Sequence, residues 1–127
     1  MIIADTDVLI DFLAGKGAGA DAVARELEDG DLHTTAITRF ELLSGARSKR
    51  QKTTIMKLLA AVPALPIDEA AADTAAEVRR ALEKAGEGIG MADSLIAGTV
   101  LRYGGAILTR NHRHFSRVNG LVLATIE

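Results

Sequence analysis

The hydrophobic positions of the chain form short apolar runs that alternate with stretches of helical periodicity. The first run covers residues 2–4 and is typical of a strand buried on both faces; it ends at Asp5. In residues 6–14 the apolar positions then recur at the spacing of one helix face. The chain therefore opens with a strand, a carboxylate and an amphipathic helix.

The same alternation continues to the end of the chain. Further strands are predicted at residues 32–37, 62–67, 106–109 and 121–126, and further helices at 20–29, 38–46, 51–60, 69–85 and 91–103. Loops are predicted at residues 15–19, 86–90 and 111–119. The segment 62–67 is expected at a sheet edge, because Pro63 and Pro66 disfavour helix before them and lack N–H donors. Strands that alternate with helices predict a single α/β domain over residues 1–127, with about five mostly parallel strands between helices.

Composition narrows the class of protein. Hydrophobic residues make up 48% of the chain but aromatic residues only 3%, so the core must consist of aliphatic side chains. The absence of cysteine excludes disulfides, thiolate metal sites and a cysteine nucleophile. No signal peptide and no apolar run of membrane-spanning length is recognisable, which predicts a soluble, cytoplasmic protein.

Charge is distributed unevenly along the chain. Residues 1–31 carry a net charge of −6 and residues 32–60 a net charge of +5, although the whole chain has only −2. A second basic group lies within residues 110–117. Such clusters are either solvated surface or a contact area for a polyanion such as nucleic acid.

Four oxygen-bearing side chains stand at the ends of predicted elements. Asp5 ends the first strand, Glu41 and Asp93 lie in the first turns of two helices, and Asn111 follows a strand. Strand ends and the starts of the following helices share one edge of a parallel sheet, so these side chains are expected to meet there. Clustered carboxylates favour a hard cation, Mg²⁺ or Mn²⁺, which would activate water for attack on a phosphodiester. This pattern points to hydrolysis of a nucleic-acid backbone.

Each acid also has a structural alternative. Thr38 and Glu41 match a capping box, and Asp93 would be stabilised by a helix dipole. Asp7 and Asp11 are expected to face solvent or to cap the first helix. Asp5 is harder to explain in this way, because a carboxylate at the end of a buried strand loses hydration.

Four segments resemble the motifs of PIN-domain ribonucleases, and most closely those of the VapC toxins of bacterial toxin–antitoxin pairs. They occur in the order of that family and cover nearly the whole chain. The matching segments are Ile3–Asp11, Thr38–Glu41 with Leu42 and Gly45, Gly90–Ala97, and Leu108–Asn111 with Phe115. Each motif is weak alone, whereas the ordered set is specific.

The resemblance implies a three-layer α/β/α PIN domain with metal-dependent endoribonuclease activity. It assigns Asp5, Glu41 and Asp93 as ligands of Mg²⁺ or Mn²⁺ and adds Asn111 at the fourth catalytic position, where many relatives have Asp. The residues assigned accessory roles are Thr6, Asp7 and Thr109. Relatives usually have Ser or Asn in place of Asp7, and often an acid in place of His114, which is therefore not counted as a ligand.

The resemblance also implies the substrate and partners. The substrate is structured RNA, such as tRNA or ribosomal RNA, and the partners are a cognate VapB-like antitoxin and a second copy of the chain. The residues expected to contact RNA are Arg39, Arg47, Lys49, Arg50 and Arg110.

Other classes fit the sequence less well. The Asp5-Thr6-Asp7 segment is similar to the Asp-x-Asp of haloacid-dehalogenase-like phosphatases, but no lysine follows Lys84. A response-regulator receiver would need an acceptor Asp near mid-chain and a late lysine. A PIN-like domain that binds RNA or protein without cutting remains open, because Asn111 replaces an acid.

Overall fold

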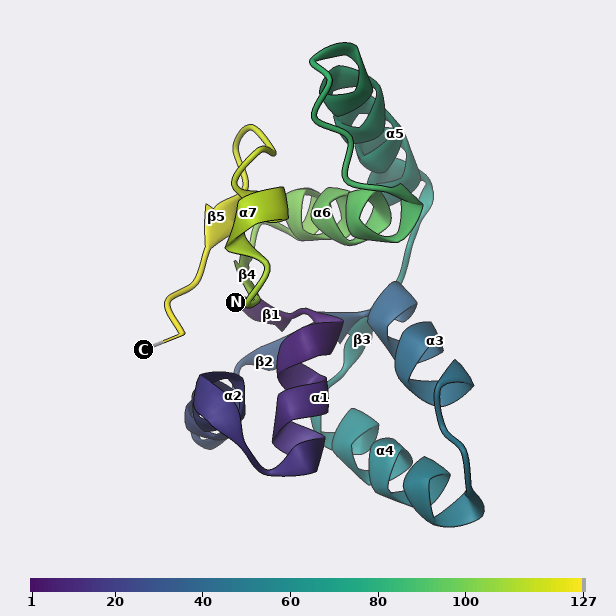
Figure 1. Cartoon of the computed structure of the whole chain (residues 1–127), viewed down its shortest axis with the longest axis vertical. Coiled ribbons are helices and arrows are strands. Elements are labelled where there is room, and N and C mark those ends of the chain that lie inside the picture. Colours follow the sequence, from purple (N-terminus) through teal and green to yellow (C-terminus); the bar gives the residue numbers. More distant parts are fainter. Residues whose placement is uncertain (127) are drawn as a thin grey trace.

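The computed structural model describes residues 1–126 and contains one parallel five-stranded sheet (Figure 1). The strand order is β3-β2-β1-β4-β5, and all four pairings are parallel. The strands are β1 (Ile2–Ala4), β2 (Leu32–Thr35), β3 (Ala64–Leu65), β4 (Ala106–Leu108) and β5 (Val122–Leu123). The predicted parallel α/β architecture is confirmed.

Helices cover both faces of this sheet. They are α1 (Thr6–Ala14), α2 (Gly17–Asp29), α3 (Ala36–Ser44), α4 (Lys49–Ala61), α5 (Glu69–Lys84), α6 (Met91–Tyr103) and α7 (His112–Phe115). Because strand side chains alternate between faces, Ala4 packs with apolar residues of α1–α4, whereas Ile3 packs with those of α5–α7. In Figure 1 the two helical layers lie below and above the sheet.

The second strand is shorter than predicted. It ends at Thr35, which becomes the N-cap of α3: its hydroxyl accepts a hydrogen bond from the Thr38 N–H at 3.1 Å. The helix therefore starts at Ala36, and Glu41 lies in its second turn instead of its first. The capping-box alternative for Thr38 and Glu41 is wrong, because Thr35 already caps this helix.

The predicted loop at 15–19 is also too long, because α2 begins at Gly17. Its glycines permit close packing: a Cβ at Gly19 would collide with the Asp11 carboxylate of α1. The glycine-rich stretch predicted as a loop thus allows α1 and α2 to pack closely.

The carboxyl-terminal part differs from prediction in two respects. The predicted loop at 111–119 contains the short helix α7, in which Phe115 is fully buried. The edge strands β3 and β5 each have two residues, shorter than the predicted 62–67 and 121–126. Strands at sheet edges lack a second partner, and the flanking prolines remove donors from β3.

Helices α5 and α6 pack with their backbones unusually close. Gly98 of α6 is buried, and a Cβ at this position would lie 2.5 Å from the Cβ and the backbone nitrogen of Ala75 in α5. This contact holds α5 on α6, and α6 carries Asp93 in its first turn, as predicted. No helix in the described part of the chain is long and apolar enough to span a bilayer.

Candidate active site

Asp5 lies at the carboxyl edge of the sheet, where β1 and β4 end. Its backbone N–H donates to the Leu108 carbonyl at 2.9 Å, which ties the two strand ends together. Its Oδ1 accepts from the Thr6 N–H at 2.8 Å, and its Oδ2 accepts from the Thr109 hydroxyl at 2.7 Å. The side chain is therefore fixed in direction by residues from both ends of the sequence.

The Asp5 carboxylate is buried without a compensating cation. The residue is 6% exposed, and no salt bridge within residues 1–126 involves it. Burial raises the pKa of Asp5 to about 6; the neighbouring Asp7 and Asp93 raise it as well, while the bonds from Thr109 and Thr6 oppose the rise. A cation bound here would stabilise the charged form.

Glu41 is joined to this carboxylate through Thr6. The Thr6 hydroxyl donates to Glu41 Oε1 at 2.7 Å and lies 3.0 Å from the Thr38 hydroxyl. Thr6 thus links α1, which Asp5 caps, to α3.

Asp7 and Asp11 do not face solvent as expected, because the segment after β4 covers them. Asp7 Oδ2 accepts from the Arg110 backbone N–H at 3.0 Å, and Asp11 Oδ2 pairs with the Arg110 guanidinium at 2.7 Å. Burial raises the pKa of Asp7, although the Arg110 N–H and charge lower it. Asp7 Oδ1 is buried and has no hydrogen-bond partner among the described residues.

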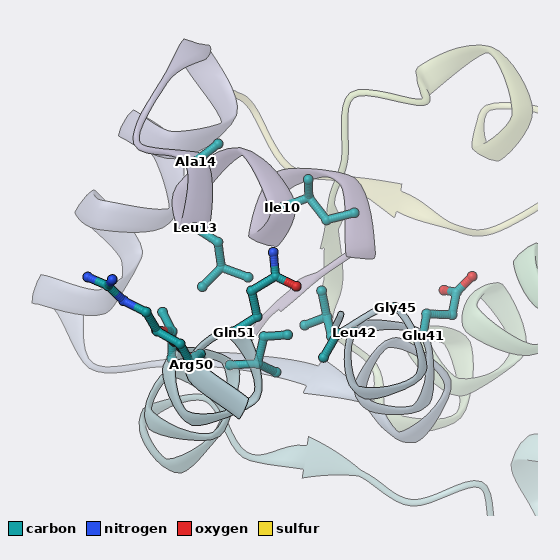
Figure 2. Close-up of a pocket in the computed structure, with 11 residues that line it drawn as sticks. Ile10, Leu13, Ala14, Glu41, Leu42, Gly45, Arg50 and Gln51 are labelled. Carbon is teal, nitrogen blue, oxygen red and sulfur yellow. Dashed lines mark hydrogen bonds between the residues drawn. The ribbon is translucent and has the colours of Figure 1, made fainter. Parts of the chain in front are cut away.

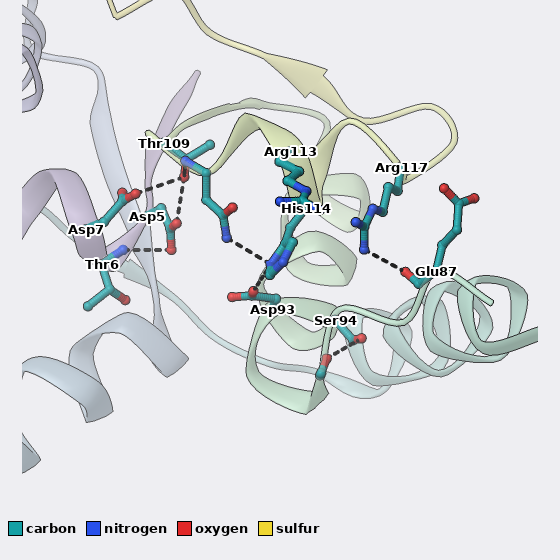
Figure 3. A network of polar contacts seen from close by, with 12 residues as sticks. Asp5, Thr6, Asp7, Glu87, Asp93, Ser94, Thr109, Arg113, His114 and Arg117 are labelled. Atoms are coloured by element: carbon teal, nitrogen blue, oxygen red, sulfur yellow. Dashed lines mark hydrogen bonds and ion pairs between the residues drawn. The ribbon is translucent and has the colours of Figure 1, made fainter. Parts of the chain in front are cut away.

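Asp93 reaches the same edge from α6 and contacts α7 (Figure 3). His114 Nδ1 lies 3.3 Å from Asp93 Oδ2 and 3.1 Å from Asn111 Nδ2. Sequence reasoning missed the contact of His114 because it treated residues 111–119 as a loop. In a helical turn, positions 111 and 114 fall on one face, so this spacing indicates the contact between His114 and Asn111 but not the one with Asp93.

The donor set fits a divalent cation that retains waters. In the described part of the chain, no three His, Asp or Glu side chains form a ready-made metal-binding group. However, magnesium-type ions commonly use one or two carboxylates and complete their shell with water and phosphate. A buried, uncompensated Asp5 and the unpartnered Oδ1 of Asp7 are the features that such an ion would satisfy.

The basic residues proposed for RNA contact occupy different environments. Arg110 is held by Asp11, and Arg39 lies 4.0 Å from the Met56 sulfur. Three exposed residues lie around the start of α4: Arg47, Lys49 and Arg50. Arg110 is exposed too, but its guanidinium is paired with Asp11. The first turn of α4 has no acid, so its cations face the positive end of the helix dipole, an arrangement that does not favour helix stability.

An apolar groove adjoins Glu41 (Figure 2). It has a volume of about 530 Å³ and lies between α1, α3 and α4, with Glu41 and Arg50 on its wall. Ile10, which lines it, is 52% exposed although it lies in a helix that packs on the sheet. Such an exposed apolar surface is typical of a binding site.

The sheet edge gathers Asp5 from the end of β1, Glu41 from α3 and Asp93 from α6, and the segment after β4 adds the amide of Asn111. Acidic clusters of this kind are typical of metal-dependent nucleases. The family model for the PIN domain matches residues 2–121 of this chain. This match excludes the phosphatase and receiver alternatives.

Named relatives narrow the assignment. The chain is 32% identical to Ribonuclease VapC10 of Mycobacterium tuberculosis, over 91% of this chain and 86% of the relative. It is also 32% identical to the tRNA(fMet)-specific endonuclease VapC of Shigella flexneri, over 92% of this chain and 91% of the relative. The fold matches that of DNA-bound VapBC from Salmonella typhimurium, with a TM-score of 0.89, 23% identity and coverage of 99% and 98%. The chain therefore belongs to the PIN-domain family and, within it, to the VapC ribonucleases.

Proposed function

We propose that this protein is the toxin of a toxin–antitoxin pair and a metal-dependent endoribonuclease that cuts structured RNA, with tRNA or ribosomal RNA as substrate. The observation that carries the proposal is the buried Asp5 carboxylate. It lacks a cation partner among residues 1–126 and lies at the sheet edge near Glu41, Asp93 and Asn111. The Shigella relative is a tRNA(fMet)-specific endonuclease, which supports the substrate class.

The proposed ligands of Mg²⁺ or Mn²⁺ are Asp5 and Asp93, with Glu41 nearby. Such an ion, when bound, supplies Lewis-acid activation of water and neutralises charge on the phosphate. Thr6 and Thr109 keep both Asp5 oxygens oriented, and Thr6 also holds Glu41 Oε1 at the same edge. Glu41 is thereby positioned to accept a proton from an attacking water.

The proposed RNA-contact area is the start of α4. Arg47, Lys49 and Arg50 are exposed there, and Arg50 lies on the groove that adjoins Glu41. Only four aromatic residues occur in the chain, so backbone charge and RNA shape would supply binding more than base stacking. RNA binding should therefore weaken as salt rises.

The metal-removal experiment tests the activity. Purified protein is stripped with a chelator, incubated with bacterial tRNA and ribosomal RNA, and resupplied with Mn²⁺ or Mg²⁺ while new RNA 5′ ends are mapped. We expect discrete new ends only after metal is restored. RNA binding without new ends under either metal would support the non-cutting alternative and overturn the proposal.

The proposed antitoxin-binding site is the groove between α1, α3 and α4. A VapB-like segment with apolar side chains would cover Ile10 and lie beside Glu41, which explains how binding would silence the enzyme. The Salmonella structure is a VapBC complex, which supports a partner of this kind.

Ile10→Lys is expected to weaken binding of the cognate antitoxin by about tenfold or more, because a charge would stand where the antitoxin is proposed to bury an apolar side chain. RNA cleavage should change little, since Ile10 has no role at the acidic edge. Isothermal titration with antitoxin measures the first effect, and Val122→Lys, at another exposed apolar position, is the control. Unchanged antitoxin affinity in Ile10→Lys would exclude this groove.

A further inference from the structure

His114 occupies a position between two groups that it cannot satisfy together. Its Nδ1 lies 3.1 Å from Asn111 Nδ2, which donates, and 3.3 Å from Asp93 Oδ2, which accepts. A ring nitrogen carries either a hydrogen or a lone pair. With the Asn111 amide oriented so that Nδ2 faces the ring, Nδ1 can accept from Asn111 or donate to Asp93, and one of the two contacts stays unsatisfied.

A metal ion would use the same two atoms without this conflict. An imidazole nitrogen and a carboxylate oxygen both offer lone pairs to a cation. Neighbouring ligands in an octahedral shell with metal–ligand distances of about 2.1 Å lie about 3 Å apart. The separation of 3.3 Å between Nδ1 and Oδ2 is close to that value.

The helices that carry Asp93 and His114 hold these two side chains close together. Asp93 lies in the first turn of α6, and His114 belongs to α7, which is anchored by the fully buried Phe115. The Asn111 N–H donates to the Thr109 hydroxyl at 2.9 Å, and the same hydroxyl donates to Asp5. His114 is thus connected through the segment after β4 to the proposed metal ligand Asp5.

We propose that His114 is a nitrogen ligand of the divalent metal and that it makes this site prefer Mn²⁺ over Mg²⁺. This inference rests on the proposed metal site and adds one ligand and a selectivity to it. Magnesium takes oxygen ligands almost exclusively, whereas imidazole binds later first-row divalent ions well. An Asn at position 111, neutral where an acid would favour any divalent ion, leaves His114 as the group that discriminates between the two metals.

The experiment measures metal binding to the full chain in the absence of RNA. Mn²⁺ is titrated and followed by electron paramagnetic resonance, with pulsed spectra recorded to detect a directly bound nitrogen, and Mg²⁺ is measured by competition. We expect the wild-type protein to show the nitrogen coupling and to bind Mn²⁺ at least about tenfold more tightly than Mg²⁺. His114→Gln and His114→Asn should both lose the coupling and about tenfold or more of Mn²⁺ affinity, with Mg²⁺ affinity within about twofold.

Two further variants separate the possible failures. His112→Gln removes an exposed imidazole from the same helix and should retain the coupling and both affinities. Asp93→Asn should lose both metals. Suppose that Asp93→Asn loses Mn²⁺ binding. The absence of nitrogen coupling in the wild-type protein, or full Mn²⁺ affinity in the His114 variants, would then refute the role of His114 while supporting the proposed metal site. If Asp93→Asn binds both metals as the wild-type protein does, the proposed site itself is wrong, and the inference falls with it.

Discussion

The Asp5→Asn variant is expected to lose RNA cleavage by about a thousandfold. The substitution keeps the shape of the side chain but removes the charge at the one buried carboxylate of the proposed site. Loss of several kcal/mol of charge stabilisation in the transition state corresponds to a rate loss of about this size. Single-turnover cleavage of RNA with saturating Mn²⁺ measures the effect.

The same substitution should stabilise the metal-free fold at neutral pH. Because the pKa of Asp5 is raised to about 6 from an ordinary value of 3.8, the folded state binds the proton more tightly than the unfolded chain does. Stability attributable to Asp5 is therefore present below about pH 4 and is lost as pH rises to about 6. A neutral Asn avoids that loss. The free energy of unfolding of Asp5→Asn should therefore exceed that of the wild-type protein by about 1–3 kcal/mol above pH 6, and the difference should vanish near pH 4.

Asp73→Asn is the matched control, since this carboxylate is exposed on α5. It should change neither cleavage nor the pH dependence of unfolding. Cleavage by Asp5→Asn within tenfold of wild type would remove Asp5 from the catalytic assignment. A stability difference that is independent of pH would show that burial of the charge is not its cause.

The second large effect is expected at the contact between α5 and α6. Replacing Gly with Ala inside a helix normally stabilises it by about 1 kcal/mol. In Gly98→Ala, however, the new methyl group would lie 2.5 Å from the Cβ and backbone nitrogen of Ala75 and must push the helices apart. We expect a net loss of about 2 kcal/mol and a decrease of roughly 5–10 °C in the unfolding midpoint.

Denaturant and thermal unfolding of two further variants test this explanation. Gly88→Ala is the control, because a Cβ there has its nearest neighbour at 3.8 Å and should be tolerated. Ala75→Gly in the Gly98→Ala background should restore part of the stability by removing one of the colliding atoms. A Gly98→Ala protein as stable as wild type would mean that the two helices separate at no cost.

The sequence allowed the layered fold to be predicted because its signals are local. Apolar runs and helical periodicity predict all five strands and six of the seven helices found in residues 1–126. Glycine and threonine caused the errors. Gly19 is predicted as part of a break although it permits packing against Asp11, and the second strand is predicted to reach Ile37 although Thr35 ends it and caps α3. Both roles depend on partners that are not adjacent in the sequence.

The candidate site was predictable in its residues but not in its contacts. Asp5, Glu41, Asp93 and Asn111 were found from their places at element ends and from the family motifs. Four contacts were not predicted: Thr6 with Glu41, Thr109 with Asp5, Asp11 with Arg110, and His114 with Asp93. Each depends on side-chain directions across elements that periodicity does not describe.

The place of β4 in the sheet bears on when a toxic enzyme first becomes dangerous to the cell that makes it. β1 is synthesised first but lies between β2 and β4, and β4 is synthesised near the end of the chain. Asp5 is oriented by Thr109, which follows β4, so a polypeptide still emerging from the ribosome lacks one side of the proposed active site. At the proposed site, RNA cleavage therefore requires that β4 and Thr109, near the end of the chain, have been synthesised and have left the ribosome.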